Sequence, residues 1–123
     1  MRALVIDDGK VVRRILSKLV EEYGFETFDA EDGADALKVL ENIGTVDLML
    51  VDWNMPNMNG LEFVKEVRKN DAHAAAKIMM VTTESEMDNV IQALEAGADE
   101  YVMKPFTKES INEKLALLGL INL

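Results

Sequence analysis

The sequence switches five times between a short apolar run and a longer stretch in which apolar residues recur at helical spacing, and this alternation constrains the fold most strongly. The short runs lie at residues 4–6, 25–28, 48–51, 78–81 and 101–103. The longer stretches lie at residues 11–20, 36–43, 61–67, 87–94 and 111–118. Short apolar runs are typical of buried strands, and a three- to four-residue period is typical of amphipathic helices. The pattern therefore predicts five strand–helix units.

Strict alternation of strands and helices favours a parallel sheet with helices on both faces and right-handed crossovers. The first, third and fourth runs are the most apolar, so we expect them at the centre of the sheet. The second and fifth runs lie among charged residues, as edge strands often do. We therefore predict an α/β, doubly wound (flavodoxin-like) fold with five parallel strands in the order 2-1-3-4-5 and five helices.

The composition fits one globular domain and excludes several classes of function. The 123 residues are 49% hydrophobic and 29% charged, as expected for a chain that buries a core. A net charge of −10 argues against nucleic-acid binding, because neutralising phosphates requires a basic face. The sequence has no cysteine and no signal peptide, and no apolar stretch approaches the roughly 20 residues of a membrane span. We therefore expect a cytoplasmic protein that does not bind membranes.

The residues that follow the predicted strands carry the side chains capable of chemistry. In a sheet of this kind ligands bind beyond the carboxyl ends of the strands, near the switch point between strands 1 and 3. Three carboxylates, a hydroxyl and an ammonium occupy these positions, on Asp7, Asp8, Asp52, Thr82 and Lys104. We expect them to converge on one crevice, with the second strand outside it.

Each of these residues also has an ordinary structural explanation. Asp8 can cap the first helix, and Asp52 can open the turn in "DWNMPNMNG". Ser85 can cap the fourth helix, with Asp88 as the acid of a capping box. Taken singly, such explanations are about as good as a functional role. Taken together they do poorly, because carboxylates in one crevice repel one another and no turn or cap requires three of them.

A cluster of three carboxylates requires a cation, and the available ligands select which one. Oxygen donors with few carboxylates suit Mg²⁺, which keeps several waters and leaves room for phosphate oxygens. A zinc site is not expected, because the sequence has no cysteine and its lone histidine, His73, is predicted to be solvated in a surface loop.

The geometry predicted for the sheet also brings an ammonium to the cluster. Strand 5 lies two strand spacings, roughly 10 Å, from strand 3, and a lysine can span that distance over Thr82. With a cation on one side of Asp52 and Lys104 on the other, the space between suits a phosphoryl group. The Asp52 carboxylate can then attack phosphorus and form an aspartyl phosphate.

Four motifs resemble the receiver domain of two-component response regulators. They are "VIDD" at 5–8, "VDWNMPNMNG" at 51–60, "MVTTE" at 80–84 and "YVMKPFT" at 101–107. The likeness runs from end to end, so residues 1–123 are expected to form a single receiver (response regulatory) domain. Within the family the chain is most similar to stand-alone chemotaxis regulators of the CheY type, and ordered agreement at four strand ends is a specific signal.

The resemblance implies a role for each residue that matches the family's motifs. Asp52 would be the phosphoacceptor. Asp8, Asp52 and the main-chain carbonyl of Asn54 would bind Mg²⁺ directly and Asp7 through water, with Mn²⁺ as an acceptable substitute. Thr82 would donate a hydrogen bond to the phosphoryl group.

Further roles follow from the same resemblance. Lys104 would pair with the phosphoryl group, and the Lys104–Pro105 peptide bond is expected to be cis. Tyr101 would be the aromatic switch that turns inward when Thr82 moves. Asn54 and Glu84 match positions that tune dephosphorylation, and their identities predict rapid self-dephosphorylation.

Two residues near the phosphoacceptor carry separate expectations. Thr83 is bulkier than the small residue often found beside the switch threonine, so it is expected to narrow access to Asp52. Trp53 is expected at the solvent rim, where its fluorescence should report on the site.

The resemblance also implies partners and an output. The phosphoryl donor would be a sensor histidine kinase (CheA-like), and the target a flagellar motor switch protein (FliM-like) or another protein, with a phosphatase as a further candidate partner. The switching surface would comprise the fourth helix, the fifth strand and the fifth helix of a monomer. The chain is not expected to be an enzyme beyond its own phosphorylation and dephosphorylation.

Some alternatives stay open at this point, and two others are disfavoured by the sequence. The chain can be a phosphorelay component, another single-domain regulator, or a receiver excised from a larger regulator. A Mg²⁺-dependent phosphohydrolase of the haloacid dehalogenase type would require an acid two residues after the nucleophile, where this sequence has Asn54. A flavodoxin-type cofactor carrier would require a phosphate loop rich in Ser, Thr and Gly, where this sequence has Asp7 and Asp8.

Overall fold

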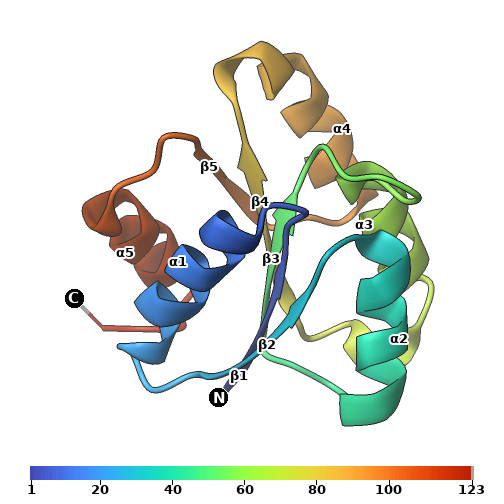
Figure 1. The fold of residues 1–123 in the computed structure, drawn as a ribbon, viewed down its shortest axis with the longest axis horizontal. Coiled ribbons are helices and arrows are strands. Elements are labelled where there is room, and N and C mark those ends of the chain that lie inside the picture. Colours follow the sequence, from blue (N-terminus) through green and yellow to red (C-terminus); the bar gives the residue numbers. More distant parts are fainter. Residues whose placement is uncertain (123) are drawn as a thin grey trace.

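The computed structural model describes residues 1–122, except for the side chains of Glu84 and Met87, and its central feature is a parallel sheet (Figure 1). The five strands are β1 (Arg2–Ile6), β2 (Glu26–Ala30), β3 (Leu48–Asp52), β4 (Lys77–Thr82) and β5 (Glu100–Met103). Their order is β2-β1-β3-β4-β5, and every neighbouring pair is parallel. The predicted flavodoxin-like strand order is therefore confirmed.

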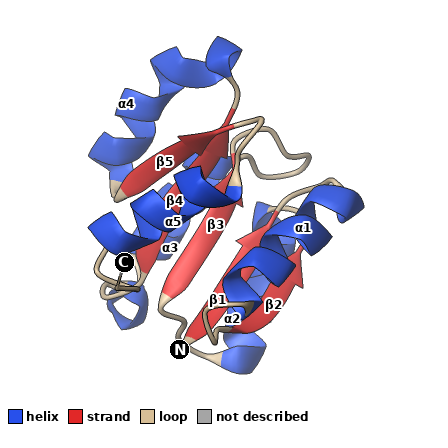
Figure 2. Cartoon of the chain, turned by 90° about the vertical axis from the view of Figure 1, so that its left-hand side faces the viewer, coloured by secondary structure: helices blue, strands red, loops and turns tan. Residues whose placement is uncertain are grey.

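Helices cover both faces of this sheet, as Figure 2 shows from the side. They are α1 (Lys10–Glu21), α2 (Gly33–Ile43), α3 (Gly60–Arg68), α4 (Met87–Ala96) and α5 (Lys108–Leu117), with short 3-10 turns η1 (Asp71–His73) and η2 (Glu84–Glu86). Buried residues of α1 and α5 pack on one face, and those of α2, α3 and α4 pack on the other. In the part of the chain that the structure describes, every helix is too short or too polar to cross a bilayer.

The central strands are apolar throughout because both of their faces are covered. In β3, Met49 and Val51 join the cluster under α2, α3 and α4, while Leu48 and Leu50 join the cluster under α1 and α5. All four side chains are fully buried. This burial explains why the strand reads as a continuous apolar run rather than as an alternating one.

The helix caps considered above as structural explanations for Asp8 and Ser85 are not formed. The N-cap position of α1 is Gly9 rather than Asp8, and it makes no side-chain capping bond. The N-cap position of α4 is Glu86 rather than Ser85, because the chain first forms η2. Asp8 is therefore left without the structural role that a helix cap would have given it.

The predicted solvent exposure of two side chains is also wrong. His73 lies in η1 and is only 8% exposed, because Arg68 folds this turn against α3 by donating to the His73 carbonyl at 2.8 Å. Trp53 is only 9% exposed. Its main-chain N–H donates to the Val81 carbonyl at 3.2 Å, so the hydrogen bonding between β3 and β4 continues by one residue. The indole then joins the core on the face covered by α2, α3 and α4.

A close backbone approach fixes the loop that follows β3. The Gly60 N–H donates to the Trp53 carbonyl at 2.9 Å, which closes the loop at the start of α3. A Cβ atom at Gly60 would lie 2.6 Å from the Asp52 carbonyl oxygen and 2.9 Å from the Met80 Cε. Glycine is therefore required here for space, and its N–H anchors the loop beside Asp52.

Replacing Gly60 by Ala is expected to destabilise the protein and to distort the end of β3. The added methyl group must push against main-chain atoms, so we expect a loss of about 1–3 kcal/mol in the free energy of unfolding. Chemical denaturation measures the loss, and amide NMR signals of Asp52 and Trp53 should shift.

Gly44→Ala is a control for this prediction. Gly44 has a φ of +82°, but the space that a Cβ atom would occupy there is open, so its substitution should cost stability through backbone strain alone. It should leave the amide signals of Asp52 and Trp53 in place. Unchanged stability and unchanged signals in Gly60→Ala would contradict the steric account.

Candidate functional site

The side chains predicted to converge do meet at the carboxyl edge of the sheet, with one exception. Asp7 and Asp8 follow β1, and Asp52 ends β3. One carboxylate oxygen from each lies within 4.8 Å of the others. Asp7 and Asp52 are buried, at 1% and 5% exposure, whereas Asp8 is exposed. The exception is Thr82, whose hydroxyl donates its hydrogen bond elsewhere.

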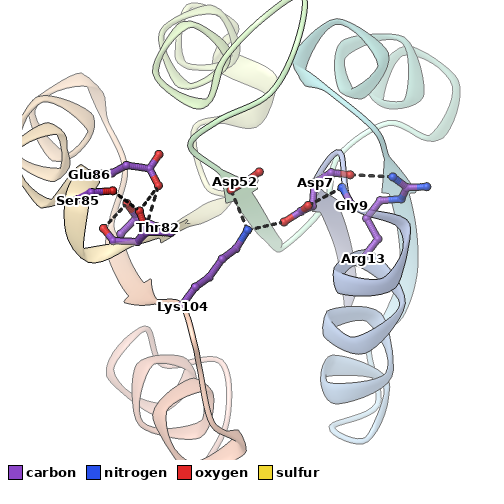
Figure 3. A network of polar contacts seen from close by, with 9 residues as sticks. Asp7, Gly9, Arg13, Asp52, Thr82, Ser85, Glu86 and Lys104 are labelled. Atoms are coloured by element: carbon purple, nitrogen blue, oxygen red, sulfur yellow. Dashed lines mark hydrogen bonds and ion pairs between the residues drawn. The ribbon is translucent and has the colours of Figure 1, made fainter.

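Lys104 reaches into the acidic cluster from β5, as Figure 3 shows. Its Nζ donates to Asp52 Oδ1 at 3.1 Å and to Asp7 Oδ2 at 3.2 Å. Its main-chain N–H donates to the Thr82 carbonyl at 2.6 Å, and the peptide bond to Pro105 is cis, as predicted. One ammonium therefore joins the carboxylates of β1 and β3 from two strands away.

The carboxylates and the ammonium shift each other's pKa values. Burial, followed by the charge of Asp7, raises the pKa of Asp52 from 3.8 to about 6, although Lys104 opposes the shift. Burial tends to lower the pKa of Lys104, but the charges of Asp52 and Asp7 outweigh it and the pKa rises. The lysine thus stays protonated, and Asp52 carries its charge at neutral pH at a cost in free energy.

Thr82 ends β4 beside the cluster but points into its own loop. Its side chain is buried, and its hydroxyl donates to the Thr83 carbonyl over a long 3.4 Å. This weak bond leaves the hydroxyl easy to redirect.

The β4–α4 loop is closed by a residue that sequence reasoning missed. Glu86 Oε1 accepts hydrogen bonds from the Thr83 N–H at 3.1 Å and from the Thr83 hydroxyl at 2.6 Å. The sequence does contain a pattern that predicts this contact, since Thr83 and Glu86 have the Thr-x-x-Glu spacing of a capping box. Thr83 is thus held by its own loop.

The loop that carries Asn54 is anchored to the β2–α2 junction. Asn57 adopts a left-handed φ of 66°, and its Nδ2 donates to Asp32 Oδ2 at 2.8 Å. Asp32 is buried and also caps α2 by accepting from the Asp35 N–H. Asn54 itself is exposed. Sequence reasoning did not identify Asp32, whose partner lies 25 residues away.

The roles predicted for Tyr101, Asn54 and Glu84 rest on the family resemblance rather than on contacts within the acidic cluster. Tyr101 is half-buried on β5, with the Lys114 Nζ 4.7 Å from its ring centroid. The side chain of Glu84 is outside the described part of the structure. The switch role of Tyr101 and the tuning roles of Asn54 and Glu84 therefore stay predictions.

The donor set fits a hard divalent cation. Asp7, Asp8 and Asp52 offer only oxygen ligands, and their closeness leaves negative charge that Lys104 offsets in part. Few carboxylates and an exposed edge suit a metal such as Mg²⁺ that retains water. The acidic cluster is therefore compatible with a metal site.

Replacing Asp52 by Asn is expected to stabilise the protein at neutral pH when EDTA removes divalent cations. The pKa of Asp52 is about 6 in the folded state against an ordinary 3.8, so the folded protein binds more protons between these values and loses stability as the pH rises through them. Thermal unfolding should show Asp52→Asn more stable by about 1–3 kcal/mol at about pH 7.5, with the difference closing toward about pH 4.

Asp29→Asn is the matched control, because Asp29 lies near the end of β2 with a side chain 59% exposed and paired with Arg13. Its loss should change the free energy of unfolding by no more than about 1 kcal/mol, and without a gain at neutral pH. A less stable Asp52→Asn variant under the same conditions would contradict the account of the cluster.

Comparison with known proteins identifies close relatives of this fold and site. A family model described as the response regulator receiver domain matches residues 3–116. Chemotaxis protein CheY1 of Helicobacter pylori is 40% identical over 119 residues, which cover 96% of each chain. Chemotaxis protein CheY of Pseudomonas aeruginosa is 39% identical over 116 residues, which cover 94% of this chain and 93% of that one.

A solved structure shows the same arrangement of strands and helices. Chemotaxis response regulator CheY4 of Vibrio cholerae matches with a TM-score of 0.86 at 32% sequence identity. The match covers 95% of this chain and 97% of that chain.

Proposed function

The chain belongs to the response regulator receiver domain family, and on this basis we propose that it is a phosphorylation-dependent signalling switch with Asp52 as its phosphoacceptor. The observation that carries this proposal is the contact of a buried Asp52 carboxylate with the Lys104 ammonium inside an acidic cluster. An anionic phosphoryl group can approach a carboxylate only where cationic groups offset the repulsion.

The contacts within the cluster favour Asp52 over Asp7 as the nucleophile. Both oxygens of Asp7 accept hydrogen bonds, Oδ1 from the Gly9 N–H at 2.7 Å and Oδ2 from Lys104. Asp52 engages Lys104 through Oδ1, which leaves Oδ2 as the attacking atom. Attack forms the bond from Asp52 Oδ2 to phosphorus while the bond from phosphorus to the donor's leaving group breaks.

The metal ligands proposed are Asp8, Asp52 and the main-chain carbonyl of Asn54, with Asp7 acting through water. The indirect role of Asp7 is supported by its two oxygens already accepting hydrogen bonds. Bound Mg²⁺, or Mn²⁺ in its place, would supply positive charge that neutralises the phosphoryl oxygens.

We propose that phosphorylation switches the surface formed by α4, β5 and α5. A phosphoryl group carries about −1.5 to −2 charges, which attract the Lys104 ammonium and a Thr82 hydroxyl donor. The long bond from Thr82 to the Thr83 carbonyl is easily given up. Movement of Thr82 would open space toward which Tyr101 turns, and the new surface would bind a target.

Partner identities are also proposals, supported by the chemotaxis names of the relatives. The donor would be a CheA-like histidine kinase, and the target a FliM-like motor switch protein in the cytoplasm. Ile91 and Leu94 of α4 are 64% and 38% exposed, and they offer apolar contacts on the switching surface. Self-phosphorylation and self-dephosphorylation would be the only reactions of the chain.

The phosphoacceptor proposal predicts that acetyl phosphate with Mg²⁺ adds the mass of one phosphoryl group to the intact protein. Asp52→Asn should add none under the same conditions, because an amide is not a nucleophile toward phosphorus. Intact mass spectrometry follows both proteins. Equal labelling of the variant, or labelling that does not depend on Mg²⁺, would exclude the proposal, and steady hydrolysis of varied phosphate monoesters would favour a phosphohydrolase instead.

Replacing Lys104 by Met is expected to separate metal binding from phosphoryl transfer. Without the competing ammonium, Mg²⁺ affinity should rise by about threefold to tenfold, measured by calorimetry. Phosphorylation by acetyl phosphate should slow by about tenfold or more, because the charge beside Asp52 is lost. Lys108→Met is the control, since Lys108 pairs with the exposed Glu22 and should change neither quantity. Weaker Mg²⁺ binding in Lys104→Met would contradict the assigned contacts.

A further inference from the structure

Arg13 connects three segments of the chain at the rim of the acidic cluster. It lies in the first turn of α1, where its N–H donates to the Gly9 carbonyl at 2.9 Å. Its Nη1 donates to the main-chain carbonyl of Asp7 at 2.8 Å (Figure 3). Its Nε donates to Asp29 Oδ2 at 3.0 Å. The guanidinium therefore joins the β1–α1 turn to β2.

The bond to the Asp7 carbonyl acts on the peptide unit that joins Asp7 to Asp8. Because this unit is planar, a donor that fixes its carbonyl restrains ψ of Asp7 and φ of Asp8, the two dihedral angles that set how the Asp7 and Asp8 side chains are directed relative to each other. The turn is also held by the Asp7 N–H, which donates to the Ala30 carbonyl at 3.1 Å. The donor from Arg13 fixes the carbonyl at the other end of Asp7, so both ends of this residue are tied.

The ion pair with Asp29 does not by itself explain the position of the Arg13 guanidinium. The Asp29 side chain is 59% exposed, and such pairs contribute little to stability. The Arg13 side chain is only 17% exposed, and its bond to the carbonyl comes from a charged donor. Asp29 holds the guanidinium in the plane from which it reaches Asp7.

We propose that Arg13 is a positioning residue for the cation site, acting through the Asp7–Asp8 peptide unit. The inference rests on the proposed function, in which Asp8 and Asp7 contribute to Mg²⁺ binding. Groups that orient metal ligands from outside the coordination sphere typically change metal affinity by about tenfold or more when removed. The second strand thus takes part in the site through Arg13, although its own side chains lie outside the crevice.

Charge and positioning predict opposite effects of removing Arg13. A cation near the site repels Mg²⁺, so simple loss of its charge would tighten metal binding. Loss of the hydrogen bond to the Asp7 carbonyl would loosen the ligands and weaken metal binding. The sign of the change in affinity therefore distinguishes the two effects.

The test is a Mg²⁺ titration of the full chain by calorimetry, with Trp53 fluorescence as a second readout. Arg13→Met is expected to bind Mg²⁺ about tenfold more weakly than the wild type. Arg13→Lys keeps the charge but cannot hold both partners in the same plane, so we expect an intermediate loss of about threefold. Arg14→Met is the matched control, because it removes the same charge from an exposed neighbour on α1, and it should bind equally well or slightly more tightly.

Circular dichroism melts in EDTA show whether each variant is folded, and Arg13→Lys serves as the readout if Arg13→Met does not fold. Wild-type affinity or tighter binding in Arg13→Lys and in folded Arg13→Met would overturn the inference while leaving the proposed function intact. A wild-type protein that binds no Mg²⁺ would instead overturn the proposed function and the inference with it.

Discussion

The contact of the Lys104 ammonium with Asp7 and Asp52 is the interaction on which the rest of the site depends. A parallel sheet places the carboxyl ends of its strands at one edge, and here that edge holds two buried carboxylates and a third exposed one. Without a cation their repulsion would favour protonation. Lys104 offsets part of this repulsion, but burial, followed by the charge of Asp7, still raises the pKa of Asp52 to about 6, so the cluster is left with affinity for further positive charge.

The balance between the repulsion of the carboxylates and the charge of Lys104 links the stability of the fold to its proposed function. A carboxylate in the folded state is costly to bury. Binding of a metal ion, or conversion to an aspartyl phosphate held by cations, would relieve part of that cost in free energy. Hydrogen bonds tie the surroundings of the cluster: the Gly60 N–H closes the loop after Asp52, and Arg13 donates to the carbonyl of Asp7. The Thr82 hydroxyl donates only a long hydrogen bond to the Thr83 carbonyl. Thr82 is the residue proposed to move, and breaking this bond would cost little.

Much of the fold and the centre of the site could be predicted from local pattern. Apolar runs identified the buried strands, and strand spacing placed Lys104 within reach of Asp52. The errors at His73 and Trp53 arose because burial depends on tertiary contacts, from Arg68 and from an extended β3 ladder. The contacts of Asp32 with Asn57 and of Arg13 with Asp29 join residues 25 and 16 positions apart, and no periodicity encodes them.

The measurement that tests the central claim most directly is chemical location of the phosphoryl group. Borohydride reduces an acyl phosphate to an alcohol, so a phosphorylated aspartate becomes homoserine in the treated chain. After reaction with acetyl phosphate and Mg²⁺, peptide mapping should find homoserine at position 52 and aspartate still present at positions 7 and 8. Homoserine at position 7 or 8, or none at position 52 in labelled protein, would contradict the assignment of Asp52 as the phosphoacceptor.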